Sequence, residues 1–236
     1  MTGVWLRPPR SPGRSGPPLH RDRIVAAAVE LLDREGVAGL TMRRLAERLG
    51  AGSTTLYWHV TNKDDVLDLA LDQIFGEVAL LGASTGDWRA DVETLLLGWR
   101  AAMLRHPWSA ALVGRPLLGP NVLTRTEFLQ SALHRAGLVE PDLSAATHAL
   151  ANYVIGAAVT LSSWRRLDDP ESRQAARQHL AAQRDRYPTL VETGHLDDRD
   201  EDDTFRRGLA YLLDGLPAEG PRRAVSGGGA SGATGR

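Results

Sequence analysis

Apolar side chains recur along this chain every three or four positions, which is the spacing of a helix face rather than of a strand. The first three helices are expected at residues 24–36, 42–49 and 53–59. Thr41 and Ser53 carry hydroxyls that suit the caps of the second and third helices. Gly36 and Gly50 provide the expected ends of the first two.

Asn62, followed three residues later by Asp65, predicts the capped start of a fourth helix. Its apolar face is formed by Leu67, Ala70, Leu71, Ile74, Val78 and Leu81. Longer helices are expected at residues 88–105, 121–136, 142–167, 170–186 and 203–215, with residues 188–203 forming a loop. Because no strand-like alternation of any length occurs, we predict an all-α fold.

Composition agrees with the helical prediction and excludes several kinds of chemistry. Leu and Ala together number 66, whereas Ile and Val number 18, and the former pair has the higher helix propensity. The absence of cysteine excludes disulfides, thiolate nucleophiles and zinc sites with Cys ligands. The apolar runs are too short to span a membrane and no signal peptide is visible, so a soluble, cytoplasmic protein is expected.

The net charge of −1 hides an uneven distribution along the chain. Residues 1–63 hold ten basic and five acidic residues (+5), whereas residues 64–236 hold 18 basic and 24 acidic ones (−6). A short, basic, three-helix unit is the electrostatic signature of a DNA-binding domain. The alternative is that Arg is simply the usual surface cation of this protein.

The second and third helices, joined by a glycine-containing turn, form the pattern of a helix-turn-helix. Its buried face is expected to contain Leu45, Ala46, Leu49, Leu56 and Val60. Ser53, Thr54 and Thr55 would then point outward at the leading end of the third helix. There they can contact base edges in the major groove.

The stretch from Arg23 to Leu71, which includes TLYWHVTNK at residues 55–63, resembles the DNA-binding domain of the TetR/AcrR family of bacterial repressors. The motifs RHPW, GPN and FRRGLAYLLDGL farther along resemble the tetracycline-repressor type of regulatory domain. The resemblance covers about residues 19–216. It implies a helix-turn-helix domain (19–66) and a helical ligand-binding and dimerisation domain (67–216). The Pro- and Gly-rich ends, an arm of residues 1–18 and a tail of residues 217–236, hold too little apolar area to offset the entropy of ordering and are expected to be disordered.

By position, the resemblance implies that Arg43, Ser53, Thr54 and Thr55 face bases, with Arg43 suited to bind O6 and N7 of a guanine. It assigns contacts with the DNA backbone to Thr41, Tyr57, Trp58, His59 and Lys63. Tyr57 and Trp58 are alternatively core aromatics. The alternative role of His59 is electrostatic: it would cap the C-terminal end of its helix, where positive charge is favourable, without contacting DNA.

For the remainder of the chain, the resemblance implies a homodimer formed by helices 142–167 and 203–215, and an effector pocket between the helices of residues 88–167. Candidates for this pocket are Trp99, Met103, His106, Trp108, Leu112, Asn121, Phe128, His148, Asn152 and Trp164. Ordinary core packing is the alternative for each of them. For His106, which precedes Pro107, the alternative is the end of a helix.

Two departures from the tetracycline-repressor pattern argue against a magnesium–tetracycline inducer. Ala79 stands where that type has its drug-binding His, and Leu112 and Val113 occupy the neighbourhood of its metal-binding His. The acidic run from Asp197 to Asp203 fits a solvated cap of the next helix better than a metal site. We therefore expect no metal and no cofactor.

No motif of a known catalytic class occurs, so an enzyme is not expected. The sequence predicts a ligand-responsive repressor that binds a palindromic DNA operator as a homodimer and is released by a small-molecule inducer. The alternative is a helical ligand-binding or interaction protein without specific operator recognition.

Overall fold

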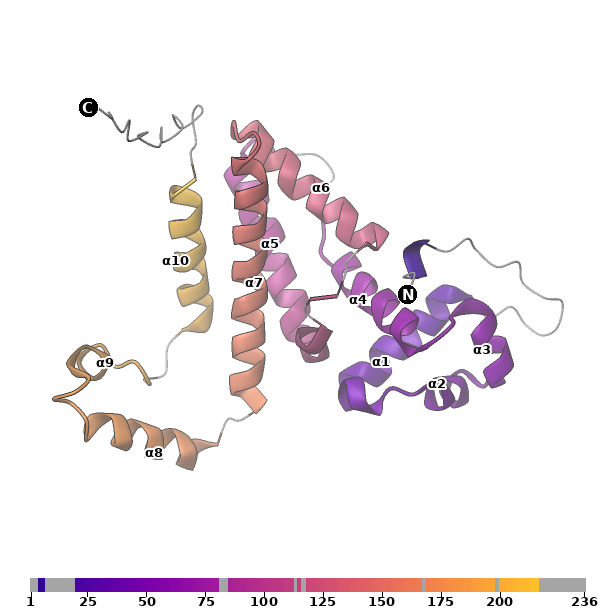
Figure 1. Ribbon diagram of the computed structural model, residues 1–236, viewed down its shortest axis with the longest axis horizontal. Coiled ribbons are helices and arrows are strands. Elements are labelled where there is room, and N and C mark those ends of the chain that lie inside the picture. The colour runs from indigo at the N-terminus through magenta and orange to yellow at the C-terminus, as the bar shows by residue number, and fades with distance from the viewer. Residues whose placement is uncertain are drawn as a thin grey trace, which may run out of the picture.

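The computed structural model describes residues 4–6, 20–80, 85–112, 114–115, 118–166, 169–197 and 200–216 of the 236. Within these residues the chain forms helices and no strand, which confirms the all-α prediction. Figure 1 shows α1–α4 gathered at one end of the molecule and α5–α10 at the other.

The N-terminal group is formed by α1 (Arg21–Gly39), α2 (Met42–Leu49), α3 (Ser53–His59) and α4 (Lys63–Gly76). Their facing sides pack around Ile24, Leu45 and Leu56, which are fully buried. Gly36 interrupts α1 as predicted, because its φ of +66° is left-handed backbone that glycine adopts without strain. A short turn then continues α1 to Gly39.

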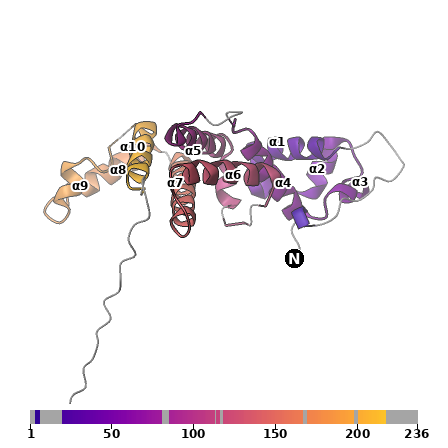
Figure 2. The ribbon, with the colours of Figure 1, turned by 90° about the horizontal axis from the view of Figure 1, so that it is seen from above.

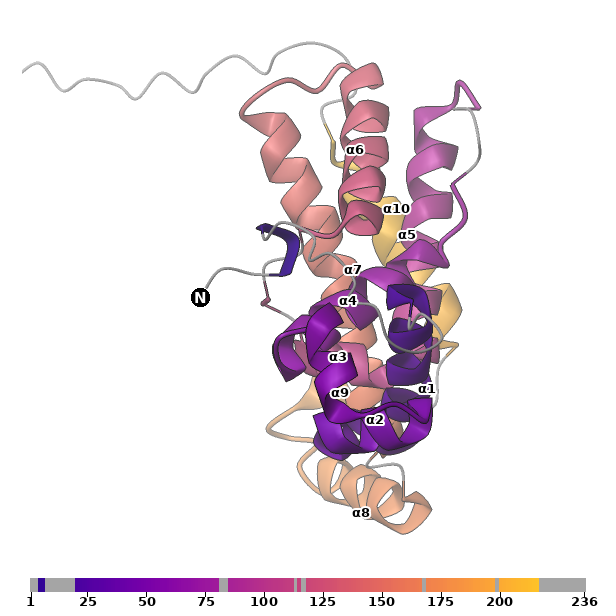
Figure 3. The ribbon, with the colours of Figure 1, turned by 90° about the vertical axis from the view of Figure 1, so that its right-hand side faces the viewer.

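The C-terminal group is built on α5 (Trp88–Arg105), α6 (Pro120–Arg135) and α7 (Asp142–Arg166), which pack side by side (Figure 3). Their contacts bury Leu96, Leu129 and Leu150 completely. A 3₁₀ helix, η2 (Pro107–Leu112), follows α5, and α10 (Glu201–Asp214) packs against α7. The predicted and observed bounds of α5 are the same.

Two predictions between α7 and α10 are wrong. The expected helix 170–186 ends earlier, as α8 (Pro170–Ala181), and the expected loop 188–203 contains α9 (Pro188–Glu192) and the first turn of α10. Pro188 begins α9 because its fixed φ suits the first helical position. Asp200 caps α10 by accepting hydrogen bonds from the backbone N–H groups of Asp202 and Asp203, which agrees with the capping role expected of the acidic run.

Helices α8 and α9 stand away from the rest of the chain. Neither contains a buried residue, and they contact one another. Seen from above, they lie at the end of the molecule opposite to α1–α3 (Figure 2). Among the helices that the structure describes, none is long and apolar enough to cross a membrane.

The N-terminal arm is partly folded. Val4–Leu6 form a 3₁₀ turn, η1, that packs against α4, and Val4 is only 6% exposed. The prediction of a disordered segment is therefore wrong for these three residues, because Val4 finds an apolar surface on α4. The remainder of the arm and the tail 217–236 lie outside the described residues.

Two predictions about helix starts have different outcomes. Asn62 caps α4 as expected, since its side chain accepts a hydrogen bond of 2.9 Å from the backbone N–H of Asp65. Ser53 is not a cap. It is the first residue of α3, and Gly52 occupies the capping position without a side-chain hydrogen bond.

Helix α4 belongs to both helical groups, and the predicted domain boundary between residues 66 and 67 falls inside it. Asp72 of α4 accepts hydrogen bonds from the backbone N–H of Val122 (3.0 Å) and the side chain of Asn121 (2.9 Å) at the start of α6. In return, Arg125 of α6 donates to the carbonyls of Gly76 and Val78 at the end of α4. Each helix thus caps the other.

The mutual caps depend on burial and close approach. Asp72 is 5% exposed and Arg125 is 7% exposed. Burial lowers the pKa of Arg125, and the charge of Asp72 opposes that shift. A Cβ on Gly119 would lie 2.1 Å from the Asp72 carboxylate, so glycine is required where α6 begins.

Replacing Asp72 with Ala should lower the free energy of unfolding by about 3 kcal/mol, because it leaves the N–H of Val122 and the amide of Asn121 without their acceptor and removes the negative charge that offsets the burial of Arg125. Urea unfolding of both variants measures the effect. Asp64→Ala, which removes a more exposed carboxylate from the same helix, is the control and should cost less than about 1 kcal/mol. Equal losses for the two variants would contradict the structural role of the Asp72 cap.

Candidate DNA-binding and effector sites

The turn between α2 and α3 has the geometry of a helix-turn-helix. Thr41 caps α2 by accepting a hydrogen bond of 3.2 Å from the backbone N–H of Arg44. Gly50 closes α2 in the left-handed region at φ +61°, with its N–H donating to carbonyls of the last turn. Gly52 then starts α3. The predicted inner face is confirmed, since the following side chains are buried: Leu45, Ala46, Leu49, Leu56 and Val60.

Helix α2 is fastened to α1 along its length. Arg44 donates to both carboxylate oxygens of Glu35, and Arg48 forms an ion pair with Glu30. The guanidinium of Arg23 also reaches the carbonyl of Leu49, at 3.4 Å. Polar contacts as well as the apolar core therefore join α2 to α1.

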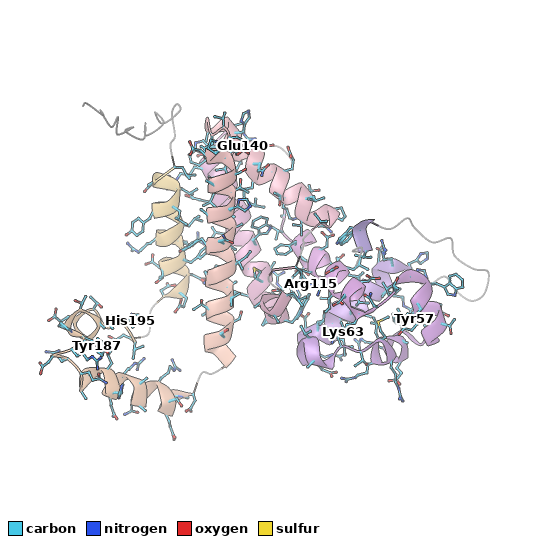
Figure 4. All side chains as sticks on the ribbon, viewed as in Figure 1. Tyr57, Lys63, Arg115, Glu140, Tyr187 and His195 are labelled. Carbon is cyan, nitrogen blue, oxygen red and sulfur yellow. The ribbon has the colours of Figure 1, made fainter. Side chains whose placement is uncertain are left out.

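Helix α3 presents a solvent-exposed face. Thr54 and Thr55 are exposed, as are the aromatic rings of Tyr57 (44%) and Trp58 (54%). These exposures exclude the alternative in which Tyr57 and Trp58 form part of the core. Figure 4 shows Tyr57 at the end of the molecule farthest from α7 and α10. The side chain of Ser53 lies outside the described part of the chain.

Arg43 lies on the exposed side of α2, with 86% of its side chain accessible. Its Nε donates to Glu47 Oε1 at 2.8 Å, and this hydrogen bond, together with the charge of Glu47, raises the pKa of Arg43. The ion pair is exposed, so exchanging it for another acceptor costs little.

His59 and Lys63 lie where α3 meets the surrounding helices. Burial lowers the pKa of His59, and the positive charges of Arg21 and His20 lower it further. The start of α1 is thus a second source of positive charge beside α3. Lys63 (Figure 4) donates a hydrogen bond of 2.7 Å to the carbonyl of Val37, which leaves its other N–H groups for a phosphate.

The structure does not bring the ten predicted effector residues together into one site. Trp99, Met103 and Leu112 are buried in the core, and Phe128 packs partly buried against it. His148 is exposed on α7, and the side chain of Trp164 lies outside the described residues.

Three of the candidates have structural partners instead. Asn121 donates to Asp72 at 2.9 Å, as described above. His106 and Trp108 both contact Asp33 of α1. His106 also forms the C-cap of α5, which agrees with the alternative of a helix end.

A cavity of about 400 Å³ lies between α5, α7 and α10. Asn152 is the predicted effector residue that lines it. The other lining residues are Arg100, Tyr153, Gly156, Ala157, Thr160, Leu161, Glu201, Thr204 and Phe205.

The polar end of the cavity is organised around Phe205. The ring of Tyr153 stacks on that of Phe205 with centroids 5.0 Å apart, and its hydroxyl donates to the Phe205 carbonyl. The guanidinium of Arg100 lies over the same Phe205 ring, 4.8 Å from its centroid, and forms an ion pair with Asp202 at 2.6 Å. Burial raises the pKa of Tyr153, so it stays a neutral hydroxyl.

Sequence reasoning missed Arg100, although one signal was present. Arg100 follows Leu96 by four positions and precedes Met103 by three, so it lies on the buried face of α5. An arginine within an apolar helix face indicates a specific partner or a site. Its pairing with α10 required knowledge of which helix packs there.

Both halves of the chain match families of known proteins. Residues 24–70 match the family described as bacterial regulatory proteins, tetR family, and residues 82–219 match the tetracyclin repressor-like C-terminal domain. An HTH-type transcriptional regulator of Saccharopolyspora erythraea is 49% identical over 216 residues, which cover 91% of each chain. The HTH-type transcriptional repressor DrrR1 of Streptomyces coeruleorubidus is 36% identical over 222 residues, covering 89% of this chain and 80% of that protein.

Solved structures agree with this match. The TetR family protein ActR of Streptomyces coelicolor, crystallised with actinorhodin, is 32% identical, with a TM-score of 0.76, and the match covers 85% of this chain and 97% of ActR. BioQ, crystallised with its double-stranded DNA operator, is 29% identical, with a TM-score of 0.61, over 86% of this chain and all of BioQ. The helix-turn-helix geometry and the matches over both halves lead to one conclusion: this chain belongs to the TetR family of transcriptional regulators, which are DNA-binding proteins and not enzymes.

Proposed function

We propose that the protein is a repressor that binds a palindromic DNA operator as a homodimer and is released by a small-molecule effector in the cytoplasm. The observation that carries this proposal is the exposed face of α3, where two threonines are followed by two exposed aromatic rings. Small hydroxyl side chains fit against base edges, and aromatic residues behind them fit the sugar–phosphate backbone. A repressor among the relatives, DrrR1, supports the sign of regulation.

We assign the base contacts to Arg43, Ser53, Thr54 and Thr55. The backbone contacts are assigned to Thr41, Tyr57, Trp58, His59 and Lys63. The free hydrogen-bonding capacity of Lys63 and the exposed rings of α3 support this division.

The candidate effector site is the cavity between α5, α7 and α10. Its volume falls within the range of small-molecule pockets, and its walls combine an aromatic pair with a buried guanidinium. ActR was crystallised with actinorhodin, a small molecule, which supports an organic effector for this chain. Ala79, at the position of the drug-binding His of the tetracycline-repressor type, supports an effector other than magnesium–tetracycline. Leu112 and Val113, in the neighbourhood of the metal-binding His of that type, support the same conclusion.

A second copy of this chain is the proposed partner of α7 and α10. Tyr211 of α10 is 73% exposed, and the α8–α9 segment, with no buried residue of its own, extends beyond the body of the chain. A single α3 buries too little surface for operator affinity, so two copies spaced one DNA turn apart are needed. An effector would act by changing the separation of the two α3 helices.

The central test is a titration of the protein against DNA fragments from the region upstream of its own gene. We expect specific binding to a near-palindrome, with an affinity that falls steeply as the salt concentration rises. Scrambled DNA of the same composition is the control. Equal affinity for both fragments would favour an interaction protein without operator recognition.

Arg43→Ala should weaken operator binding by about 1–3 kcal/mol and relax the preference at one base pair. Arg34→Ala removes the same charge from an exposed position of α1 and is the matched control. Both variants are compared by fluorescence anisotropy on operators that carry single base-pair changes. A uniform loss of affinity across all of these operators would instead indicate that Arg43 contacts the DNA backbone and not a base.

The dimer is tested by sedimentation at micromolar concentration. The wild-type chain should sediment as a dimer, and Tyr211→Asp should shift it toward monomer, because a charge would then be buried in the α7–α10 interface. Leu123→Asp, at a 49%-exposed side chain of α6 outside that interface, is the control. A wild-type monomer would refute this part of the proposal.

A further inference from the structure

The segment that joins α5 to η2 carries two buried side chains that reach α1. His106 and Trp108 are each 5% exposed. His106 Nδ1 lies 2.7 Å from Asp33 Oδ1, and Trp108 Nε1 donates to the same oxygen at 2.6 Å. A single carboxylate oxygen of the DNA-binding domain therefore takes two hydrogen-bonding groups from the regulatory domain.

The opposite side of the His106 ring is also occupied. Its Nε2 lies 3.2 Å from both carboxylate oxygens of Glu77, which follows α4, and Glu77 also forms an ion pair with Arg105. The imidazole thus stands between α1 and the end of α4, with a carboxylate on each side. We call Asp33, His106, Trp108 and Glu77 the interdomain latch.

The latch is specific because its donors are desolvated. A buried indole N–H or imidazole without a partner costs free energy, so both rings favour the one arrangement in which Asp33 lies beside them. The two rings also lie close together, with centroids 6.0 Å apart. The ring nitrogens of His106 and Trp108 are occupied by Asp33 and Glu77. They are therefore not available to bind an effector.

Helix α1 transmits this constraint to the DNA-reading surface. The same helix holds α2 through Glu30, Glu35 and Arg23, and α2 carries the turn into α3. The position of Asp33 therefore sets the orientation of α3 relative to the regulatory domain.

On the other side, η2 packs against α7 as well as against α1, α4 and α5. Helix α7 also supplies Asn152 and Tyr153 to the cavity. The segment with Trp108 thus lies between the wall of the candidate effector site and the DNA-binding domain.

We infer that His106 and Trp108 are positioning residues which, through Asp33, set the orientation of α1–α3 relative to the regulatory domain and thereby the fit of the dimer to its operator. The inference rests on the proposed function as an operator-binding dimer. It assigns these two residues to regulation of DNA binding and not to the effector site.

The first test is a double-mutant cycle of Asp33→Asn and His106→Gln, read as the ratio of operator affinity to scrambled-DNA affinity. Each single variant should lower this ratio about tenfold, and the double variant should lower it by much less than the product of the two losses, because both remove the contact between His106 and Asp33. Glu127→Gln, at an exposed position of α6, makes the same change of charge as Asp33→Asn and should leave the ratio unchanged. Independent, additive losses would overturn the latch.

Trp108→Phe supplies a variant that keeps the ring packing and removes only the N–H group. It should lower the operator ratio less than Asp33→Asn does, while the melting temperature stays close to that of the wild type. If Trp108→Phe and Asp33→Asn were both folded and kept the wild-type ratio of operator affinity to scrambled-DNA affinity, the inference would be contradicted.

The second test needs no operator. Because the chain has no cysteine, Asp22→Cys on α1 and Thr94→Cys on α5 introduce two unique sites for spin labels. With labelled chains diluted into unlabelled protein, the distance distribution should be narrow in the wild-type background and broader with Asp33→Asn. An unchanged distribution would refute the latch, whereas wild-type protein that binds operator and scrambled DNA equally would refute only the proposed function.

Discussion

The reciprocal capping of α4 and α6 is the contact on which the rest of the molecule depends. Asp72 satisfies the first turn of α6, and Arg125 satisfies the last carbonyls of α4, so neither helix end is complete without the other. Helix α4 also packs against α1, so its position is constrained by contacts with both helical groups. The contact between α4 and α6 therefore joins the two helical groups directly. Arg115, between the two helical groups in Figure 4, adds ion pairs to Asp64 and Asp68 along the same helix.

The helix-turn-helix was predictable because its signals are local. The Thr41 cap, the Gly50 terminus and the Asn62 cap each act within four residues, and the apolar spacing around Leu45 specifies the buried face without reference to other helices. Ser53 was misassigned because a serine suits both the cap and the first helical position, and the backbone at Gly52 decides between them. The helices α8 and α9 were less predictable because they bury no face, which removes the periodic pattern on which the prediction relies.

The effector region was predicted less well for a different reason. His106, Trp108 and Asn121 have the residue types expected of a ligand pocket, yet their partners lie 73, 75 and 49 positions away in the sequence. Such pairings depend on which helices pack together, and a single sequence does not contain that information. The same holds for the cavity, where Arg100 of α5 meets Phe205 of α10. Residue type predicted that these side chains have partners, and only the fold shows which partners they have.

Lys63 is the one lysine in the chain, and its amine donates a hydrogen bond to the carbonyl of Val37 in α1. Reagents that acylate side-chain amines therefore have a single internal target, at the junction of α1 and α4. Acylation there removes the positive charge and leaves a single amide N–H as donor. The protein thus carries its own chemical reporter: under the proposed function, DNA over the start of α4 would lower the reactivity of this one amine, with no background from any other lysine.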